Sequence, residues 1–349
     1  MVPVEEVTLA QDDRPIIVVG AARSGTTMLQ LMLHAHGRIA VPPENRFVLR
    51  AYQNRRDFGD LRVEANRRKL AHFICKEKGS GFGDLGLDAD ATMAEIVAGP
   101  PTLGSALGIA LRAYARKFGK TRWGDKRPSY LANLHMIRDL FPDAQVVHII
   151  RDGRDCVASL KEAPWHRGGV PTAVAGWCRG MDEGARAART WAPGSYFEMY
   201  YERLVSDPEP ELRRLCDFLG EPFDPAMTEP SSVAGVAVPE RKTWHALTHG
   251  EVTSKRIGSW SRRLDPAEIG LCEAVMGRRL VAHGYELTGL GSATLSQWAH
   301  YVPAGTHDLM SRAKRAFITR FHHARPRADL ADRVVRPATD QPVPTPEAP

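Results

Sequence analysis

The hydrophobic pattern of the chain predicts buried strands that alternate with helices. The unbroken apolar run at 16–19 is typical of a strand covered on both faces, and the mostly apolar runs at 144–150 and 195–201 predict two further strands. A shorter strand is expected at 121–127. Apolar residues at helical spacing follow or separate these runs, at 24–36, 103–118, 129–140, 151–160, 171–189 and 208–219. This order implies parallel strands joined by right-handed crossovers, so we expect an α/β fold with a mainly parallel sheet between two layers of helices.

Other segments are expected to surround this core. Residues 46–118 form a helical insertion in which 46–78 is basic, and four glycines at 79–86 indicate a flexible loop that borders the site. Residues 221–253 have little pattern, and a helix begins near Pro266. The chain then divides into an N-terminal tail at 1–14, a main domain at 15–288, a helical C-terminal extension at 289–336 and a disordered tail at 337–349. At 309–323, apolar residues are mixed with basic residues, and this pattern predicts a helix. We expect the helix to pack on its own domain rather than on a membrane surface.

Composition narrows the possible ligands. The chain has 349 residues and a formal net charge of +6, which favours an anionic ligand but is too mild to indicate nucleic acid. Its five cysteines form no C-x-x-C pair, so neither a disulfide framework nor a zinc site is predicted. A cytoplasmic location is expected, because residues 1–14 lack the apolar run of a signal peptide or anchor.

A phosphate-binding loop follows the first strand. The strand ends at Gly20, and Ser24-Gly25-Thr26-Thr27 opens a helix, so backbone N–H groups and the helix dipole converge on one point. The stretch resembles a P-loop, which predicts a P-loop-like three-layer sandwich, but Thr26 stands where a triphosphate-binding loop carries lysine. Its cation is instead Arg23, which suits a nucleotide 5′-phosphate.

A second anion site is predicted at the end of the strand at 144–150. Phosphohydrolases usually place an aspartate at such a position to hold Mg²⁺. Here Arg151 ends the strand, and Ser159 lies about two helical turns further on. Both side chains donate hydrogen bonds to phosphate. Taken alone, Arg151 would be interpreted as a surface arginine that caps a helix.

Together, these motifs resemble sulfotransferases that use 3′-phosphoadenosine 5′-phosphosulfate (PAPS), closest to bacterial enzymes related to tyrosylprotein sulfotransferases. The resemblance covers about residues 15–285. It implies a sulfuryl transfer to an acceptor hydroxyl without a metal, with Arg151 and Ser159 on the 3′-phosphate. The loop that it assigns to the 5′-phosphosulfate comprises Arg23, Ser24, Gly25, Thr26 and Thr27.

The resemblance also implies further roles. Lys126, in Gly-Asp-Lys, would contact the transferring sulfuryl group with Arg23 nearby, and Tyr201 ends a matching strand. Glu44 stands where the related enzymes place their catalytic base, after two stiffening prolines. A late loop would close over the nucleotide with Ser254, Lys255, Arg256, Gly258 and Trp260. Rival bases are His34, His36 and His148.

Two other classes of function remain open from the sequence, a P-loop kinase and a non-catalytic nucleotide-binding protein. The absent Walker lysine argues against the first, and the pair of Glu44 and Lys126 argues against the second. The acceptor is expected to be a small metabolite or a lipid-linked hydroxyl compound, bound by segments within 46–118 and 160–190. A homo-oligomer is left open.

Overall fold

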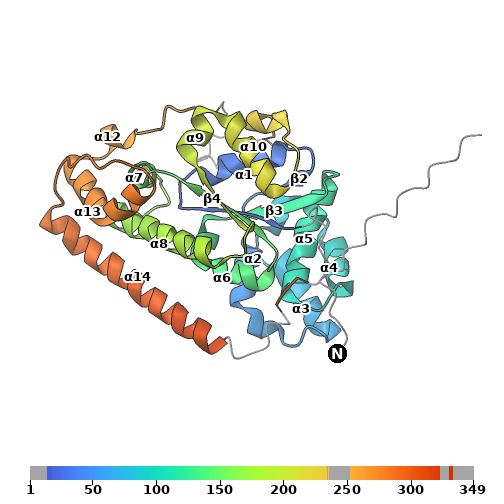
Figure 1. Cartoon of the computed structure of the whole chain (residues 1–349). Helices are drawn as coiled ribbons and strands as arrows, with labels where there is room; N and C mark the ends of the chain where they lie inside the picture. The colour runs from blue at the N-terminus through green and yellow to red at the C-terminus, as the bar shows by residue number, and fades with distance from the viewer. Residues whose placement is uncertain (1–13, 234, 236–251, 323–329, 333–349) are drawn as a thin grey trace, which may run out of the picture.

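The structure is a computed structural model that describes residues 14–233, 235, 252–322 and 330–332 (Figure 1). All but Arg14 of the predicted N-terminal tail lies outside the described residues, and so does the predicted disordered tail at 337–349.

A five-stranded sheet forms the centre of the molecule, in the order β2-β3-β1-β4-β5. Every pairing between these strands is parallel. Their bounds are β1 (Ile16–Gly20), β2 (Ile39–Ala40), β3 (Arg122–Lys126), β4 (Gln145–Ile150) and β5 (Tyr196–Tyr200). The predicted α/β fold with a mainly parallel sheet is therefore confirmed. The sequence pattern missed β2 as a strand, because two residues are too few to show a period.

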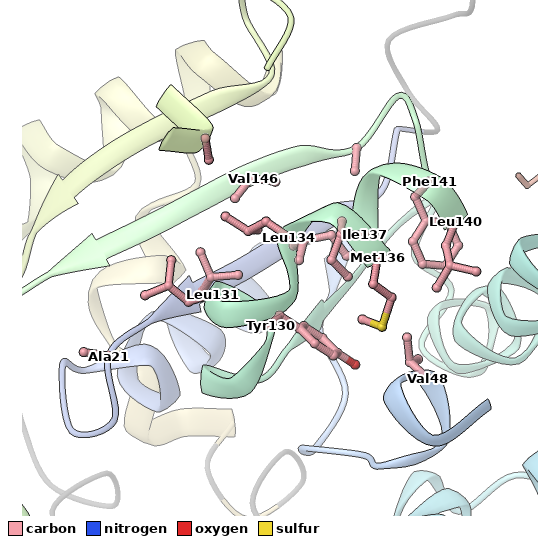
Figure 2. Close-up of a cluster of buried hydrophobic side chains, with 14 of the residues drawn as sticks. Ala21, Val48, Tyr130, Leu131, Leu134, Met136, Ile137, Leu140, Phe141 and Val146 are labelled. Atoms are coloured by element: carbon pink, nitrogen blue, oxygen red, sulfur yellow. The ribbon is translucent and has the colours of Figure 1, made fainter. Parts of the chain in front are cut away.

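Helices cover both faces of the sheet, since alternate residues of each strand point to opposite sides (Figure 1). Ile16 and Val18 of β1 pack in one apolar cluster with α1 (Thr26–Ala35), α9 (Tyr201–Ser206) and α10 (Pro208–Leu219). Ile17 and Val19 belong to the other cluster, which α5 (Leu103–Lys117), α6 (Leu134–Leu140), α7 (Gly153–Lys161) and α8 (Gly169–Thr190) complete. Figure 2 shows part of this second cluster, where α6 packs beneath β4.

The insertion at 46–118 has two features that the sequence pattern did not indicate. Residues 46–78 are helical, as expected, and contain α2 (Phe47–Gln53), the 3₁₀ helix η2 (Arg55–Phe58) and α3 (Glu64–Cys75), with a break at Gly59. The expected flexible loop contains the 3₁₀ helix η3 (Phe82–Leu85), whose Phe82 and Leu85 are only 2% and 1% exposed. These two side chains anchor the loop to the core. A further helix, α4 (Ala89–Ala98), was not predicted.

The C-terminal part contains α12 (Trp260–Arg263), α13 (Pro266–Ala282) and α14 (Leu295–His322). The last of these lies beside α8 of the same chain (Figure 1). It begins well before the predicted start at 309. Before these helices, 221–253 holds the 3₁₀ helices η5 (Pro225–Thr228) and η6 (Pro230–Val233), while 234 and 236–251 lie outside the described residues.

A short C-terminal segment returns to the core. Leu330 O accepts a hydrogen bond from Gly104 N at 2.7 Å, and Asp332 N donates to Leu140 O at 2.8 Å. Asp332 also forms a buried ion pair with Arg112 of α5. Such close contact requires a glycine in α5, because a Cβ on Gly104 would lie 2.5 Å from Asp332 N. Within the described ranges, no helix is both long and apolar enough to cross a membrane.

Candidate active site

A cavity of about 1500 Å³ opens at the carboxyl ends of the strands. Each strand brings one of the predicted site residues to its lining, namely Arg23 after β1, Glu44 after β2, Lys126 at the end of β3, Arg151 after β4 and Tyr201 after β5. Parallel strands present their carboxyl ends at the same edge, which is where ligands of such sheets bind. The tertiary structure therefore gathers residues from distant parts of the chain in one place.

The loop between β1 and α1 has an unusual backbone. Arg23 has φ of 71°, the only positive φ of a non-glycine residue in the described part of the chain. Gly25 follows with φ of 99°, and a Cβ there would lie 2.6 Å from Tyr201 Cδ2. Left-handed residues turn successive N–H groups toward one side, which makes a concave anion site at the start of α1.

Arginines crowd around this loop. Arg23 Nε donates to Ser159 Oγ at 2.9 Å, so the first loop already touches the predicted 3′-phosphate site. Arg151 donates to Arg23 O at 3.1 Å and to Arg256 O at 2.9 Å, and its guanidinium lies 4.2 Å from the Tyr201 ring centre. Burial lowers the pKa of Arg23, and repulsion by Arg151, followed by smaller repulsion from other nearby arginines, lowers it further. A bound anion would relieve this repulsion.

Two buried donors in this region lack hydrogen-bond partners among the described residues. They are Arg151 Nε and Ser24 Oγ. Buried polar groups without partners are costly, and they often mark a place where a ligand completes the bonding. Ser24 itself is fully buried and does not line the cavity. The unsatisfied Nε of Arg151, which lines the cavity, and the crowded arginines fit a ligand with more than one phosphate.

A second polar group lies beside the loop. Lys126 Nζ is 3.3 Å from Glu44 Oε2 and 3.3 Å from Thr27 Oγ1. The Lys126 side chain is almost fully buried, whereas that of Glu44 is 29% exposed. Glu44 is thus accessible from the cavity while it keeps contact with a cation. This arrangement pairs a potential proton acceptor with a group that can neutralise negative charge.

The three rival histidines lie elsewhere. His34 Nδ1 accepts from Val41 N at 3.3 Å, and burial lowers the pKa of His34 to about 4. His36 contacts the carbonyl of Pro222, and His148 lies 2.7 Å from the hydroxyl of Tyr196. None of these histidines lines the cavity. Their positions are typical of packing and of hydrogen bonding within the scaffold.

The late loop is only partly at the cavity. Arg256 lines it, but Ser254, Lys255, Gly258 and Trp260 do not. Trp260 is 7% exposed and its ring lies 4.1 Å from the guanidinium of Arg154, so it packs away from the cavity. Sequence reasoning missed the residue that holds this loop. Asp155 accepts from Gly258 N at 2.9 Å and from Trp260 N at 2.8 Å. Its position in the motif Arg-Asp-Gly-Arg-Asp was the feature of the sequence that could have indicated this role.

The cavity also has an apolar side. Leu131, from the 3₁₀ helix η4 (Pro128–Asn133), and Ala173 of α8 line it, together with Pro164 and Trp165 from the connection between α7 and α8. The Trp165 side chain is 46% exposed. Within the described ranges, no group of three or more His, Cys, Asp or Glu side chains could hold a metal ion.

The fold and the cavity define a class, the α/β proteins that bind the phosphates of a ligand at the carboxyl edge of a parallel sheet. Residues 15–225 match the family model described as Sulfotransferase family, and residues 173–280 match the model described as Sulfotransferase domain. The chain belongs to the sulfotransferase family, which confirms the resemblance drawn from its motifs.

Individual relatives agree with this assignment. Protein-tyrosine sulfotransferase A of Caenorhabditis elegans is 25% identical over 214 residues, or 60% of this chain and 50% of that protein. Protein-tyrosine sulfotransferase 1 of Danio rerio is 25% identical over 289 residues, or 78% of this chain and 73% of that protein. The match thus spans half the length of the nematode relative. The solved sulfotransferase domain from the curacin biosynthetic pathway has the same fold, with a TM-score of 0.55, 20% identity and coverage of 79% of this chain and 99% of that one.

Proposed function

We propose that the protein transfers the sulfuryl group of PAPS to an acceptor hydroxyl and releases adenosine 3′,5′-bisphosphate. The observation that carries this proposal is that one cavity holds both the arginine cluster around Ser159 and the pair of Glu44 and Lys126. The cluster suits a nucleotide with two separate phosphate groups, and the pair suits the transfer of a proton next to developing charge. Membership of the sulfotransferase family supports this class of reaction.

The donor would be held by the loop after β1 and by the start of α7. Arg151 and Ser159 would donate to the 3′-phosphate, and the backbone of Gly25 to Thr27 would face the 5′-phosphosulfate at the N-terminus of α1. Arg23 joins the two regions because its side chain contacts Ser159. When bound, PAPS supplies the sulfuryl group and a leaving phosphate.

The residues beside the donor site would carry out the proton transfer. Glu44 would accept the proton of the acceptor hydroxyl at Oε2, since its carboxylate is accessible from the cavity. Lys126 would neutralise charge that develops on the transferring group and on the leaving phosphate. Thr27 keeps Lys126 oriented toward the end of the loop through its contact with Nζ.

The acceptor would lie against the apolar side of the cavity. Its walls include Leu131, Pro164, Trp165 and Ala173, and a half-exposed tryptophan offers a flat apolar surface. The cavity exceeds the roughly 300–1,000 Å³ of ordinary ligand pockets, so it has space for a donor and an acceptor together. These features support a small metabolite or a lipid-linked hydroxyl compound. Arg46 on the rim makes an acidic peptide the alternative acceptor.

The test is a transfer assay with purified protein and PAPS labelled in the sulfuryl group. The acceptor panel contains simple phenols, long-chain alcohols and an acidic tyrosine peptide, and parallel reactions contain γ-labelled ATP. We expect transfer from PAPS to a phenol or an alcohol, and none from ATP. Transfer from ATP would favour a kinase. Tight binding of adenosine 3′,5′-bisphosphate without transfer to any acceptor would favour a non-catalytic nucleotide-binding protein.

A further inference from the structure

The segment that carries Glu44 is tied to the scaffold on both sides. Before it, Pro42 O accepts a hydrogen bond from Gln30 Nε2 of α1 at 2.8 Å. After it, Arg46 N donates to Ser80 O at 2.7 Å. Glu44 therefore sits in a stretch of chain whose ends are held, and its side chain projects from the short interval between them.

Asn45, the residue next to Glu44, links this segment to the end of the neighbouring strand β3. It is completely buried, and its Nδ2 donates to Asp125 Oδ1 at 2.8 Å. The same carboxylate oxygen accepts the backbone N–H of Lys126, also at 2.8 Å. One oxygen atom thus joins the neighbour of Glu44 to the backbone of Lys126. Arg127 strengthens the link by donating to the backbone carbonyl of Asn45.

Asp125 is well suited to this task because it cannot move freely. It is 1% exposed, and its other oxygen, Oδ2, accepts from the hydroxyl of the buried Tyr130 at 2.6 Å. Burial raises the pKa of Asp125, while hydrogen bonds from Tyr130, Asn45 and Lys126 N oppose that rise. A buried carboxyl group whose two oxygens are both engaged has few alternative conformations.

We propose that Asp125 and Asn45 are positioning residues that set the placement of Glu44 relative to Lys126. Glu44 follows β2 and Lys126 ends β3, so their contact of 3.3 Å joins two separate segments of the chain. The hydrogen bond between Asn45 and Asp125 holds these two segments together directly beside that contact. This inference rests on the proposed function, in which Glu44 is the base. Neither residue lines the cavity, so neither would touch donor or acceptor.

The experiment measures kcat for sulfuryl transfer and the Kd of adenosine 3′,5′-bisphosphate in Asn45→Ala. We expect kcat to fall by about 10- to 100-fold, the effect of a displacement on the order of 1 Å at a reacting group. The Kd should stay within about twofold, because the arginine cluster is untouched. Asn66→Ala is the matched control. It removes an asparagine side chain that donates to Asp60 O on the surface and does not line the cavity, so kcat should change by less than about threefold.

Two further variants separate positioning from simple loss of stability. Asp125→Asn keeps an acceptor oxygen for Asn45 and Lys126 N, so it should retain most of the activity that Asp125→Ala loses. In a Glu44→Gln background, Asn45→Ala should cause almost no further loss of kcat, because it acts through Glu44.

The outcomes decide between the alternatives. An unchanged kcat in Asn45→Ala would overturn the inference. An equal fall in kcat when Asn45→Ala is introduced into the wild type and into Glu44→Gln would also overturn it. A wild-type protein that transfers nothing from PAPS would instead refute the proposed function, and a fully active Glu44→Gln would refute the role of the base. Thermal melting of each variant shows whether it is folded under the assay conditions.

Discussion

The role of Arg151 allows the sharpest test of how the donor is recognised. Arg151→Ala removes the guanidinium proposed to hold the 3′-phosphate, but it also removes the hydrogen bonds to Arg23 O and Arg256 O and the contact with Tyr201. A hydrogen bond to a charged group contributes about 1.5–3 kcal/mol, so loss of a two-point phosphate contact should cost about 3 kcal/mol. That is a loss of affinity of about a hundredfold.

Comparison of two ligands separates recognition from damage to the scaffold. Adenosine 3′,5′-bisphosphate and adenosine 5′-monophosphate share every group except the 3′-phosphate, so the scaffold bonds affect both equally. Calorimetric titration should show the full loss for the bisphosphate and less than about a fivefold loss for the monophosphate. Arg213→Ala is the control for net charge, because Arg213 pairs with Glu209 on the surface, away from the cavity. Equal losses for the two ligands would refute the assignment of Arg151.

Three other predictions concern the base, the metal and the C-terminal segment. Glu44→Gln should lower turnover by a factor of about 10²–10⁴ and leave nucleotide affinity unchanged. If Glu44→Gln turns over normally and His34→Gln is inactive, Glu44 is not the base. EDTA should leave turnover intact, and a loss that Mg²⁺ reverses would contradict a metal-free reaction. Gly104→Ala should destabilise the protein by about 1–3 kcal/mol, although alanine usually favours helix, because its Cβ would lie 2.5 Å from Asp332 N. Its melting temperature is compared with that of Gly83→Ala, where no atom lies within 4 Å of the new Cβ.

Local patterns were sufficient to predict much of the fold. β1 is a short apolar run, β4 and β5 are mostly apolar, and α10 begins and ends at the residues that its proline and Gly220 indicate. Parallel order then follows from the alternation of strands and helices. The order also implies that Arg23, Lys126 and Arg151 meet at one edge, as the cavity lining shows. Their roles in binding and catalysis remain predictions.

The failures have a common cause in the absence of a local signal. β2 is only two residues long, and its strand character comes from pairing with β3. The glycines at 79–86 predict flexibility, but Phe82 and Leu85 are buried by contacts with residues elsewhere in the chain. The placement of Trp260 also depends on distant residues, since its ring packs against Arg154 and Asp155 accepts from its backbone N–H. Its contact with a nucleotide stays a prediction.

The sequence by itself determined most of the strands and helices, the loop of Arg23 to Thr27 between the first strand and helix, and the family, because each of these depends on residues close together in the chain. Only the tertiary structure decided which side chains pair within the cavity. Glu44 and Lys126 are separated by 82 positions, and Arg23 and Ser159 by 136. Whether such side chains lie 3 Å or 10 Å apart depends on strand register and on buried links such as that of Asn45 to Asp125. Those links arise from the packing of the whole sheet, and no local pattern of residues encodes them.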